Sequence, residues 1–175
     1  MGRVQRSEHV FAYPWEVVSA AFWRKYPHPM LPHVEKMEVI SRFLDEQGCL
    51  HTARLGKCTP ANVPSWVTRV LGTHYSYVYE ESVCDPVDKT LRLQSANLSF
   101  RSLAVVDEIC SYSAPPRLSS SAPTTLYTQT SRVRAFFPFV SRAFEEYWVE
   151  RGTEAAHQGI SAMEDLCSEQ CHTPR

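Results

Sequence analysis

The segment RKYPHPMLPHV, residues 24–34, places two adjacent cations and two histidines among three prolines. Lys25 and His33 raise the question of what they hold, because cationic side chains bind anionic groups through charge-assisted hydrogen bonds. The alternative is that they hold nothing and the prolines form only a stiff, solvated turn. These residues alone leave both interpretations open.

Two further cations, Arg54 and Lys57, lie in the strand-like run CLHTARLGK. Successive side chains of a strand point to opposite faces, so residues three apart do not share a face unless a bulge intervenes. This spacing weakens a simple cluster of Lys25, His33, Arg54 and Lys57. For each of the four, the competing interpretation is a solvated surface cation.

The sequence contains no catalytic motif of the common kinds. GxSxG, the Walker A pattern, GxGxxG and HExxH are all missing. Asp107 and Glu108 are adjacent on a predicted strand, so they point to opposite faces and cannot form an acid/base pair. We therefore expect a protein that is not an enzyme and that uses no cofactor.

The six cysteines do not predict a metal site or a disulfide framework. None forms a CxxC pair, and only Cys167 and Cys171 stand close together, four residues apart. A zinc site usually shows two closely spaced pairs. Free thiols in the core or on strands are the expected state, and no bound metal is expected.

Length and composition favour one globular domain. The chain has 175 residues, 43% of them hydrophobic, which is enough for a real core. Its formal net charge of −1 argues against a protein that grips nucleic acid by charge alone. No apolar run approaches the ~20 residues that span a bilayer. The N-terminus, MGRVQRSEHVF, lacks the apolar core of a secretory signal.

Hydrophobic periodicity predicts strands and helices in a simple order. A short strand is predicted at EHVFAY, residues 8–13, and a helix begins near Pro14 and runs to Tyr26. A hairpin follows, turning at DEQG, and then a short apolar insert at residues 59–72. From Phe136 onward the period is helical, although Gly152 and Gly159 interrupt it at about 1 kcal/mol each. Four further strands are predicted between the insert and this helix, at residues 74–84, 90–100, 104–113 and 124–135.

This order indicates an α+β fold, in which an antiparallel sheet has its helices on one face. If the sheet curls around the long C-terminal helix, the space between them becomes a ligand cavity. Such cavities are concave and mostly apolar, with few polar groups.

The insert TPANVPSWVTRVLG is unusually apolar for a connection. Trp66 follows the two prolines of the insert and stands beside valines, which suits a membrane interface. The competing interpretation is a lid folded onto the sheet. The two are compatible if the lid opens. The residues expected to form the lid and to contact the membrane are Val63, Pro64, Trp66, Val67, Arg69, Val70 and Leu71.

Several runs together resemble the PRELI-like domain of mitochondrial lipid transfer proteins. They are EHVFAYPWEVV, FWRKYPHPMLPHV, ISRFLDEQGCLHTARL, VPSWV, SVCDPVDKTLRLQSANLSF and VVDE. The resemblance covers nearly the whole chain, so we expect residues 1–175 to form a single PRELI-like domain with a structured core at about residues 3–170. The KYP-x-P-x-x-P-H-V element and the DPV-x-KT turn are its most specific features.

The resemblance implies a curved seven-stranded antiparallel sheet that wraps a long C-terminal helix and encloses a lipid cavity under a lid. It implies a shuttle that carries an anionic glycerophospholipid between the mitochondrial outer and inner membranes and contacts the membrane surface transiently. It also implies a partner, a small helical-hairpin protein with twin cysteine pairs. The expected location is the mitochondrial intermembrane space, reached without a cleaved presequence.

The resemblance also implies the site residues. Lys25 and His33 flank the phosphate-binding end of the cavity, with Arg54 and Lys57 contributing from the hairpin. The chain departs from the family pattern in three places: YPHP replaces YPNP, Cys58 replaces a lysine, and RGTEAAHQGI, residues 151–160, lacks the usual Asn and Lys.

Two alternatives stay open. Some runs resemble the branch associated with phosphatidylserine and others the branch associated with phosphatidic acid. The missing Asn and Lys also suit a module that keeps the fold but binds a partner or a membrane without transporting lipid.

Overall fold

The structure is a computed structural model that describes residues 2–59, 75–115, 122–136 and 141–172. Most of its strands alternate more and less buried side chains, whereas Val34–Leu44 is exposed along most of its length. Its last helix is far longer than its first. The elements are β1 (Arg3–Phe11), α1 (Trp15–Phe22), β2 (Val34–Leu44), β3 (Leu50–Cys58), β4 (Ser76–Asp85), β5 (Thr90–Asn97), β6 (Ala104–Ser113), β7 (Thr125–Ala135) and α3 (Ser141–His172).

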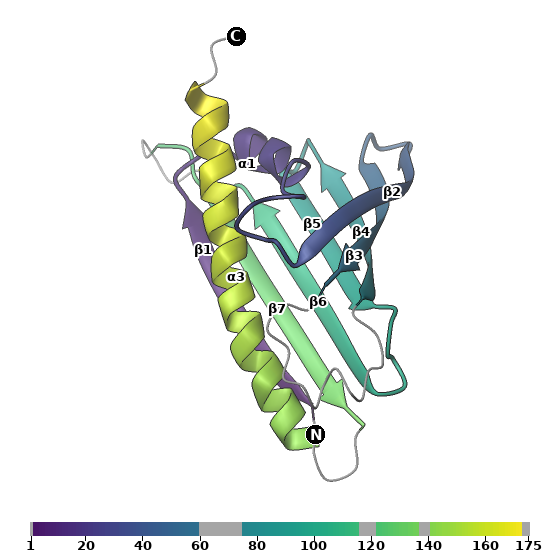
Figure 1. Ribbon diagram of the computed structural model, residues 1–175. Coiled ribbons are helices and arrows are strands. Elements are labelled where there is room, and N and C mark those ends of the chain that lie inside the picture. Colours follow the sequence, from purple (N-terminus) through teal and green to yellow (C-terminus); the bar gives the residue numbers. More distant parts are fainter. Residues whose placement is uncertain (1, 60–74, 116–121, 137–140, 173–175) are drawn as a thin grey trace.

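The strands form one antiparallel sheet in the order β1-β7-β6-β5-β4-β3-β2. Neighbours in the sheet are neighbours in the chain except for β1, which pairs with β7 and thereby brings the two ends of the sequence together. Strand β2 is the other edge, and its pairing with β3 is interrupted at Val34/Lys36 and at Val39/Ser41. Such bulges bend a strand and increase its twist, and β2 crosses the rest of the sheet obliquely (Figure 1).

Helix α3 runs along one face of the sheet, packed on β1 and β7, while α1 packs against α3 and β6 (Figure 1). Pro14 forms the N-cap of α1, and its carbonyl accepts hydrogen bonds from the backbone amides of Val17 and Val18. The sequence predicts this start correctly. The helix ends at Phe22 rather than at Tyr26, because the proline-rich segment that follows takes an extended path.

Two hydrophobic clusters hold the helices to the sheet at opposite ends. The first cluster lies under α1 and contains Phe11, Trp15, Val18, Ala21, Phe22, Leu91, Leu93, Cys110, Tyr112, Tyr127, Met163, Leu166 and Cys167. The second lies at the start of α3 and contains Ala104, Val133, Ala135 and Phe144, with Val106, Trp148 and Val149 packed against it.

A line of polar side chains crosses the same face of the sheet between the two clusters. Its members are paired in turn from β3 to β7, and we call them the interior polar row: Arg54, Glu80, Ser95, Glu108 and Ser131. On β6, Glu108 stands between Val106 of the second cluster and Cys110 of the first. The interior is therefore apolar at both ends and polar in the middle.

The fold class predicted from the sequence is confirmed. The hairpin, the four later strands and the long helix are present, while β1 begins earlier than predicted because it pairs with β7 over its whole length. The predicted lid, residues 63–71, lies outside the described residues. The cavity stays a prediction here. Within the described residues, no helix is long and apolar enough to cross a membrane.

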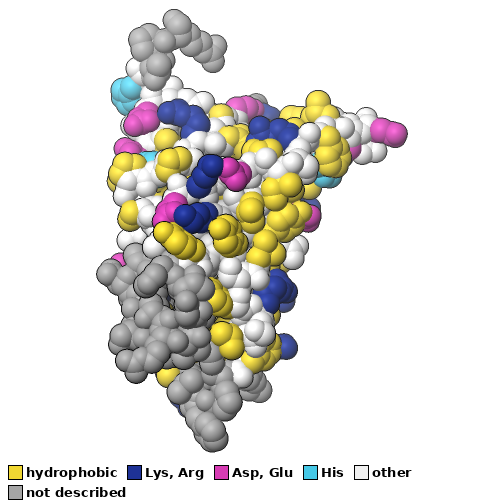
Figure 2. All heavy atoms as spheres, turned by 45° about the vertical axis from the view of Figure 1, so that its right-hand side comes forward, with side chains coloured by type: hydrophobic (Ala, Val, Ile, Leu, Met, Phe, Trp, Pro, Cys, Tyr) yellow, Lys and Arg dark blue, Asp and Glu magenta, His cyan; other side chains and the backbone are white. Residues whose placement is uncertain are grey.

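Hydrophobic, cationic and anionic side chains are interleaved on the face of the molecule shown in Figure 2. That face carries no broad patch of a single charge. The distribution agrees with the nearly neutral composition of the chain.

Asn97 ties the end of β5 to the turn that leads into β6. Its Nδ2 donates to the carbonyls of Ser99 (2.7 Å) and Ala104 (2.9 Å), and its Oδ1 accepts from the Val106 amide at 2.8 Å. Asn97→Ala should lower the free energy of unfolding by about 1–3 kcal/mol, because the half-buried backbone groups lose their partners. Urea unfolding measures this, with Gln94→Ala, an exposed position of the same strand, as the control. Equal midpoints for the two variants would contradict the assignment.

Candidate functional site

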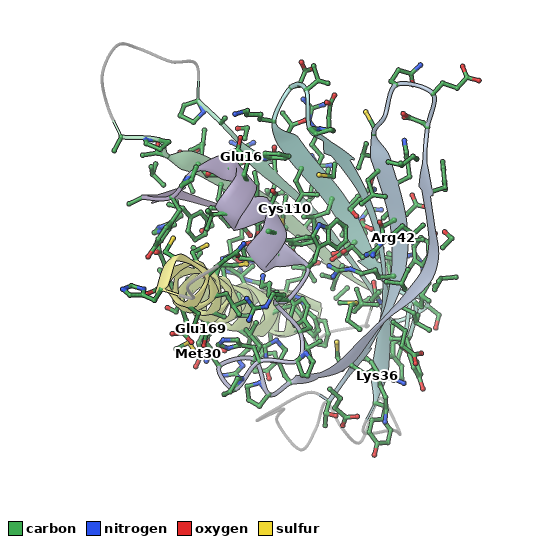
Figure 3. All side chains as sticks on the ribbon, turned by 90° about the horizontal axis from the view of Figure 1, so that it is seen from above. Glu16, Met30, Lys36, Arg42, Cys110 and Glu169 are labelled. Atoms are coloured by element: carbon green, nitrogen blue, oxygen red, sulfur yellow. The ribbon has the colours of Figure 1, made fainter. Side chains whose placement is uncertain are left out.

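The proline-rich segment between α1 and β2 is fastened to helix α3. Arg24 pairs with Glu169 at 3.5 Å, and His28 Nε2 lies 3.5 Å from an oxygen of Asp165. Leu31, near its middle, is almost fully buried. Seen from above in Figure 3, α1 and this segment lie between α3 and the β2–β3 hairpin. The segment is thus fastened to α3 and contributes Leu31 to the interior, while Arg24, Pro27, Pro29, Met30 and Pro32 stay exposed.

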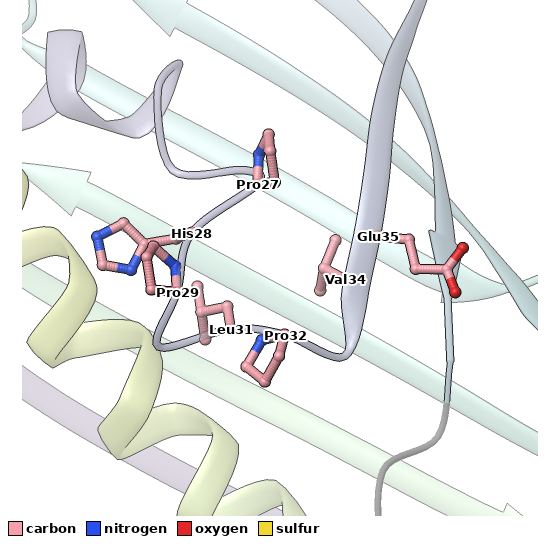
Figure 4. A pocket seen from close by; sticks show the side chains of 7 residues that line it. All are labelled: Pro27, His28, Pro29, Leu31, Pro32, Val34 and Glu35. Carbon is pink, nitrogen blue, oxygen red and sulfur yellow. The ribbon is translucent and has the colours of Figure 1, made fainter.

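The outer side of this segment forms a surface depression of about 460 Å³ (Figure 4). His28 lies on its α3 side and Glu35 on its β2 side. Most of the remaining lining is apolar and rigid: Pro27, Pro29, Leu31, Pro32 and Val34. A second depression, of about 480 Å³, is lined by Met30, Glu154, His157, Gln158 and Ser161.

Lys25 points to the inner side, toward α3. Its Nζ lies 3.3 Å from the position that a Cβ would occupy at Gly159, and 5.3 Å from the centre of the Tyr26 ring. A glycine at this position lets the ammonium approach the helix closely. Among the described residues, no carboxylate lies within ion-pair distance of Lys25.

The surroundings of Lys25 keep it charged. Burial by itself lowers the pKa of Lys25, but the acidic groups of Tyr26, Tyr112, Cys110 and Glu108 act in the opposite direction and raise this pKa above its usual value. The side chain is only half-buried although it lies between α3 and the sheet. The result is an ammonium that is positive at neutral pH and has no carboxylate partner among the described residues.

His33, at the end of the segment, lies in the positive potential of Lys25 and Arg151. Burial lowers the pKa of His33 below its usual value of 6.5, and the charges of Lys25 and Arg151 lower it further. The imidazole is therefore neutral in the absence of an anion. An anionic group placed beside it would favour the protonated form, because opposite charges stabilise each other.

Arg151 is a cation that the sequence analysis missed. It lies on α3 and donates a 2.6 Å hydrogen bond from Nη1 to Glu154. The run RGTEAAHQGI lacks Lys and Asn, but it begins with this arginine. The signal that could have found it is helical spacing, since Arg151 stands eight residues, or about two turns, before Gly159.

Arg54 faces the interior but is already paired. Its Nε and Nη2 donate to the same oxygen of Glu80 at 2.8 and 2.6 Å, and its guanidinium lies 4.6 Å from the centre of the Phe22 ring. The exposed fraction is 4% for Arg54 and 5% for Glu80. Burial raises the pKa of Glu80 in spite of the neighbouring guanidinium. The charge of Arg54 in the interior is therefore largely neutralised by the Glu80 carboxylate.

Lys57 lies on the outer face of the sheet, as the strand alternation in the sequence indicates. Its Nζ pairs with Glu35 at 2.9 Å and lies 3.9 Å from the centre of the Tyr75 ring. The structure therefore brings Lys25, His33 and Arg151 into one electrostatic neighbourhood and places Arg54 on the same interior. It does not bring Lys57 to them, and a headgroup-binding role for Lys57 stays a prediction without support from this geometry.

Lys25, His33 and Arg151 offer cationic or protonatable groups, which suit the binding of an anion. The described residues contain no group of His, Cys, Asp and Glu side chains that could hold a metal ion. The six cysteines are unpaired in the structure. The residues expected to form the lid, Val63 to Leu71, lie outside the described residues, so no membrane contact is assigned to them.

The fold is shared with solved structures of low sequence identity. The protein TTHA0849 from Thermus thermophilus superposes with a TM-score of 0.64 at 13% identity, covering 96% of this chain and 99% of that one. The Zhui aromatase/cyclase from Streptomyces sp. R1128 superposes with a TM-score of 0.62 at 12% identity, covering 99% and 98%. These likenesses show a START/Bet v1-like fold and nothing about activity.

Comparison with protein sequences gives closer relatives. The model of the PRELI-like family matches residues 16–173. The "Protein slowmo homolog" of Dictyostelium discoideum is 33% identical over 159 residues, which cover 90% of this chain and 68% of the relative. The "Protein UPS2, mitochondrial" of Saccharomyces cerevisiae is 36% identical over 158 residues, covering 88% and 67%.

The low pKa of His33 predicts a pH dependence of stability. As the pH falls through 6.5, the unfolded chain takes up a proton at this position and the folded protein does not, so the free energy of unfolding falls until the lower, folded-state pKa is reached. In His33→Gln this contribution is absent. We expect the variant to lose less stability than the parent between pH 7 and 5, measured by urea unfolding. A steeper loss in the variant would mean that the fold raises this pKa.

Proposed function

This chain belongs to the PRELI-like family, and on that premise we propose that it is a transfer protein for an anionic glycerophospholipid, phosphatidic acid or phosphatidylserine. The observation that supports this most is the Lys25 ammonium, which is charged, half-buried between α3 and the sheet, and without an ion pair among the described residues. A phosphate on the ligand would supply the missing negative charge, and His33 and Arg151 would reinforce it.

The interior described above is apolar at both ends and polar in the middle, and this distribution suits an amphiphilic ligand. The headgroup would lie at Lys25 beside the interior polar row, and the acyl chains would extend along the apolar walls. Each buried methylene is worth about 0.8 kcal/mol, so the chains leave a bilayer only if they enter an apolar cavity directly. We propose that such a cavity opens between α3 and the curved sheet, covered by residues 63–71 with Trp66 at the membrane surface.

The proposed place of action is the mitochondrial intermembrane space, between the two membranes. A relative of this chain is named mitochondrial, which supports the organelle. We further propose that a small helical-hairpin protein with twin cysteine pairs stabilises the domain, because an interior that must open for a ligand packs less densely than an ordinary core. The site binds and releases its ligand unchanged and performs no catalysis.

The alternative is a module that keeps this fold without transporting lipid. Extraction of the purified protein, co-expressed with its partner, and mass spectrometry of the extract distinguish the two. A stoichiometric phospholipid supports the shuttle and identifies the headgroup, whereas a protein that contains and transfers none supports the module.

Lys25→Met tests the headgroup site. Loss of a charge-assisted contact should slow transfer between liposomes by roughly tenfold to a hundredfold. The fold should be retained, because the substitution removes a partly buried charge that has no ion pair. Lys36→Met, at an exposed lysine of the β2 edge paired with Glu38, is the matched control. Equal transfer rates for both variants would remove Lys25 from the site.

Gly159→Ala separates stability from binding. Alanine favours a helix interior over glycine by about 1 kcal/mol, and the new methyl group would meet only the flexible end of Lys25 at 3.3 Å. We expect a higher free energy of unfolding together with slower transfer, because the ammonium is displaced from its place on the helix.

The control for this substitution is Gly152→Ala, which makes the same exchange in the same helix. Its methyl group would meet the Gln5 side chain instead of Lys25. Transfer by this variant should match the parent. If Gly159→Ala also transfers like the parent, close packing of Lys25 on the helix has no part in binding.

A further inference from the structure

The side chain of Glu108 is a carboxylate of the interior polar row with neutral partners only. Its Oε2 accepts a hydrogen bond from Gln129 at 2.5 Å, and its Oε1 accepts one from the Cys110 thiol at 3.4 Å. Along the row it is paired with Ser95 on one side and Ser131 on the other. A carboxylate can accept about four hydrogen bonds, so Glu108 keeps acceptor capacity for a further donor.

The other carboxylate of the row, Glu80, differs from Glu108 in this respect. Arg54 donates two hydrogen bonds to it, and both side chains are almost fully buried. The two charges of that pair neutralise each other, and their burial leaves them inaccessible to a ligand. Glu108 is only half-buried and has no cation within ion-pair distance among the described residues. Of these two interior acids, Glu108 is the one that can meet a ligand.

Lys25 and Glu108 act on each other across the same interior. The carboxylate contributes to the negative potential at Lys25, yet the two groups form no ion pair. A positive and a negative side chain that belong to the same interior and form no ion pair with each other are suited to a ligand that carries both charges. The phosphate of such a ligand would lie at Lys25, and its cationic group would lie at Glu108.

The charge balance of the interior favours the same conclusion. Arg54 is paired with Glu80 and Arg151 with Glu154, whereas Lys25 and Glu108 are a cation and an anion without an ion pair among the described residues. A phosphate monoester without a cationic group would compensate Lys25 but leave Glu108 beside an added negative charge, and like charges in a partly buried site repel. An ammonium on the headgroup offsets this repulsion at Glu108, fully in phosphatidylethanolamine and partly in phosphatidylserine, whose carboxylate adds a negative charge.

We propose that Glu108 is the residue that determines headgroup specificity, by accepting hydrogen bonds from the primary ammonium group of an aminophospholipid. This inference rests on the proposed function, which supplies the phospholipid. It divides the two candidate lipids by their chemistry: phosphatidylserine carries the ammonium and phosphatidic acid does not. Phosphatidylethanolamine shares the ammonium and is a second source of the same chemistry.

The test is competition for binding in mixed vesicles. The full chain is incubated with vesicles that contain equal amounts of phosphatidylserine, phosphatidylethanolamine, phosphatidic acid and N-acetyl phosphatidylserine, and the bound lipids are quantified by mass spectrometry. The N-acetyl lipid keeps the phosphate and the carboxylate but lacks the ammonium. The parent should bind phosphatidylserine about tenfold more than its N-acetyl form, the factor expected for one charge-assisted hydrogen bond.

Glu108→Gln should reduce this ratio to near one without abolishing binding, because Lys25 remains. Asp107→Asn is the matched control, since it makes the equivalent change at the adjacent residue, whose side chain points to the outer face beside Arg132. It should keep the ratio of the parent. A Glu108→Gln variant with the ratio of the parent would overturn the inference.

Two further outcomes keep the inference and the proposed function apart. If the parent binds phosphatidic acid or the N-acetyl lipid as tightly as phosphatidylserine, Glu108 does not select for an ammonium. This outcome is measured on the parent protein and does not depend on whether a variant folds. If the parent binds no phospholipid at all, the proposed function itself fails. The phosphatidylserine and phosphatidylethanolamine arms show which ammonium source the site accepts.

Discussion

A positive charge inside this protein must be compensated, and the arrangement around Lys25 follows from that constraint. An ammonium taken out of water loses its hydration and needs nearby negative charge or donors and acceptors in its place. Lys25 forms no ion pair among the described residues. Tyr26, Tyr112 and Cys110 are neutral near pH 7, because burial raises the pKa of each, so Glu108 is the charged group among the four that act on Lys25. The segment that presents it is fixed at both ends, by α1 and β2, and by ion pairs to α3.

The two hydrophobic clusters make this arrangement compatible with a stable fold. Each cluster joins helix to sheet at one end of the interior, so the polar middle does not have to contribute packing energy. Two charged members of the interior polar row also pair with each other. Arg54 and Glu80 neutralise each other under Phe22, while the serines of the row add hydroxyl groups that can serve as donors or acceptors.

Much of the fold could be predicted from the sequence, because alternation and helical period are local properties. The hairpin, the four later strands and the long helix follow from these patterns, and the same alternation indicates that Arg54 and Lys57 point to opposite faces. The partner of Arg54 could not be predicted in this way. Glu80 lies 26 residues away, and only the register between β3 and β4 places it opposite. Arg151 was missed for a similar reason, since its relation to His33 depends on how α3 crosses the sheet.

The sheet never closes on itself, because its edge strands β1 and β2 lie at opposite ends of the strand order. A closed barrel has a circumference fixed by its strand number and shear. This sheet has no such fixed girth, so its curvature can change without breaking a ladder between strands. The bulges of β2 and its charged residues Lys36 and Glu38 guard the open edge against pairing with another chain. On the proposed function, an incomplete barrel of adjustable width would hold acyl chains of different length and saturation with a single backbone.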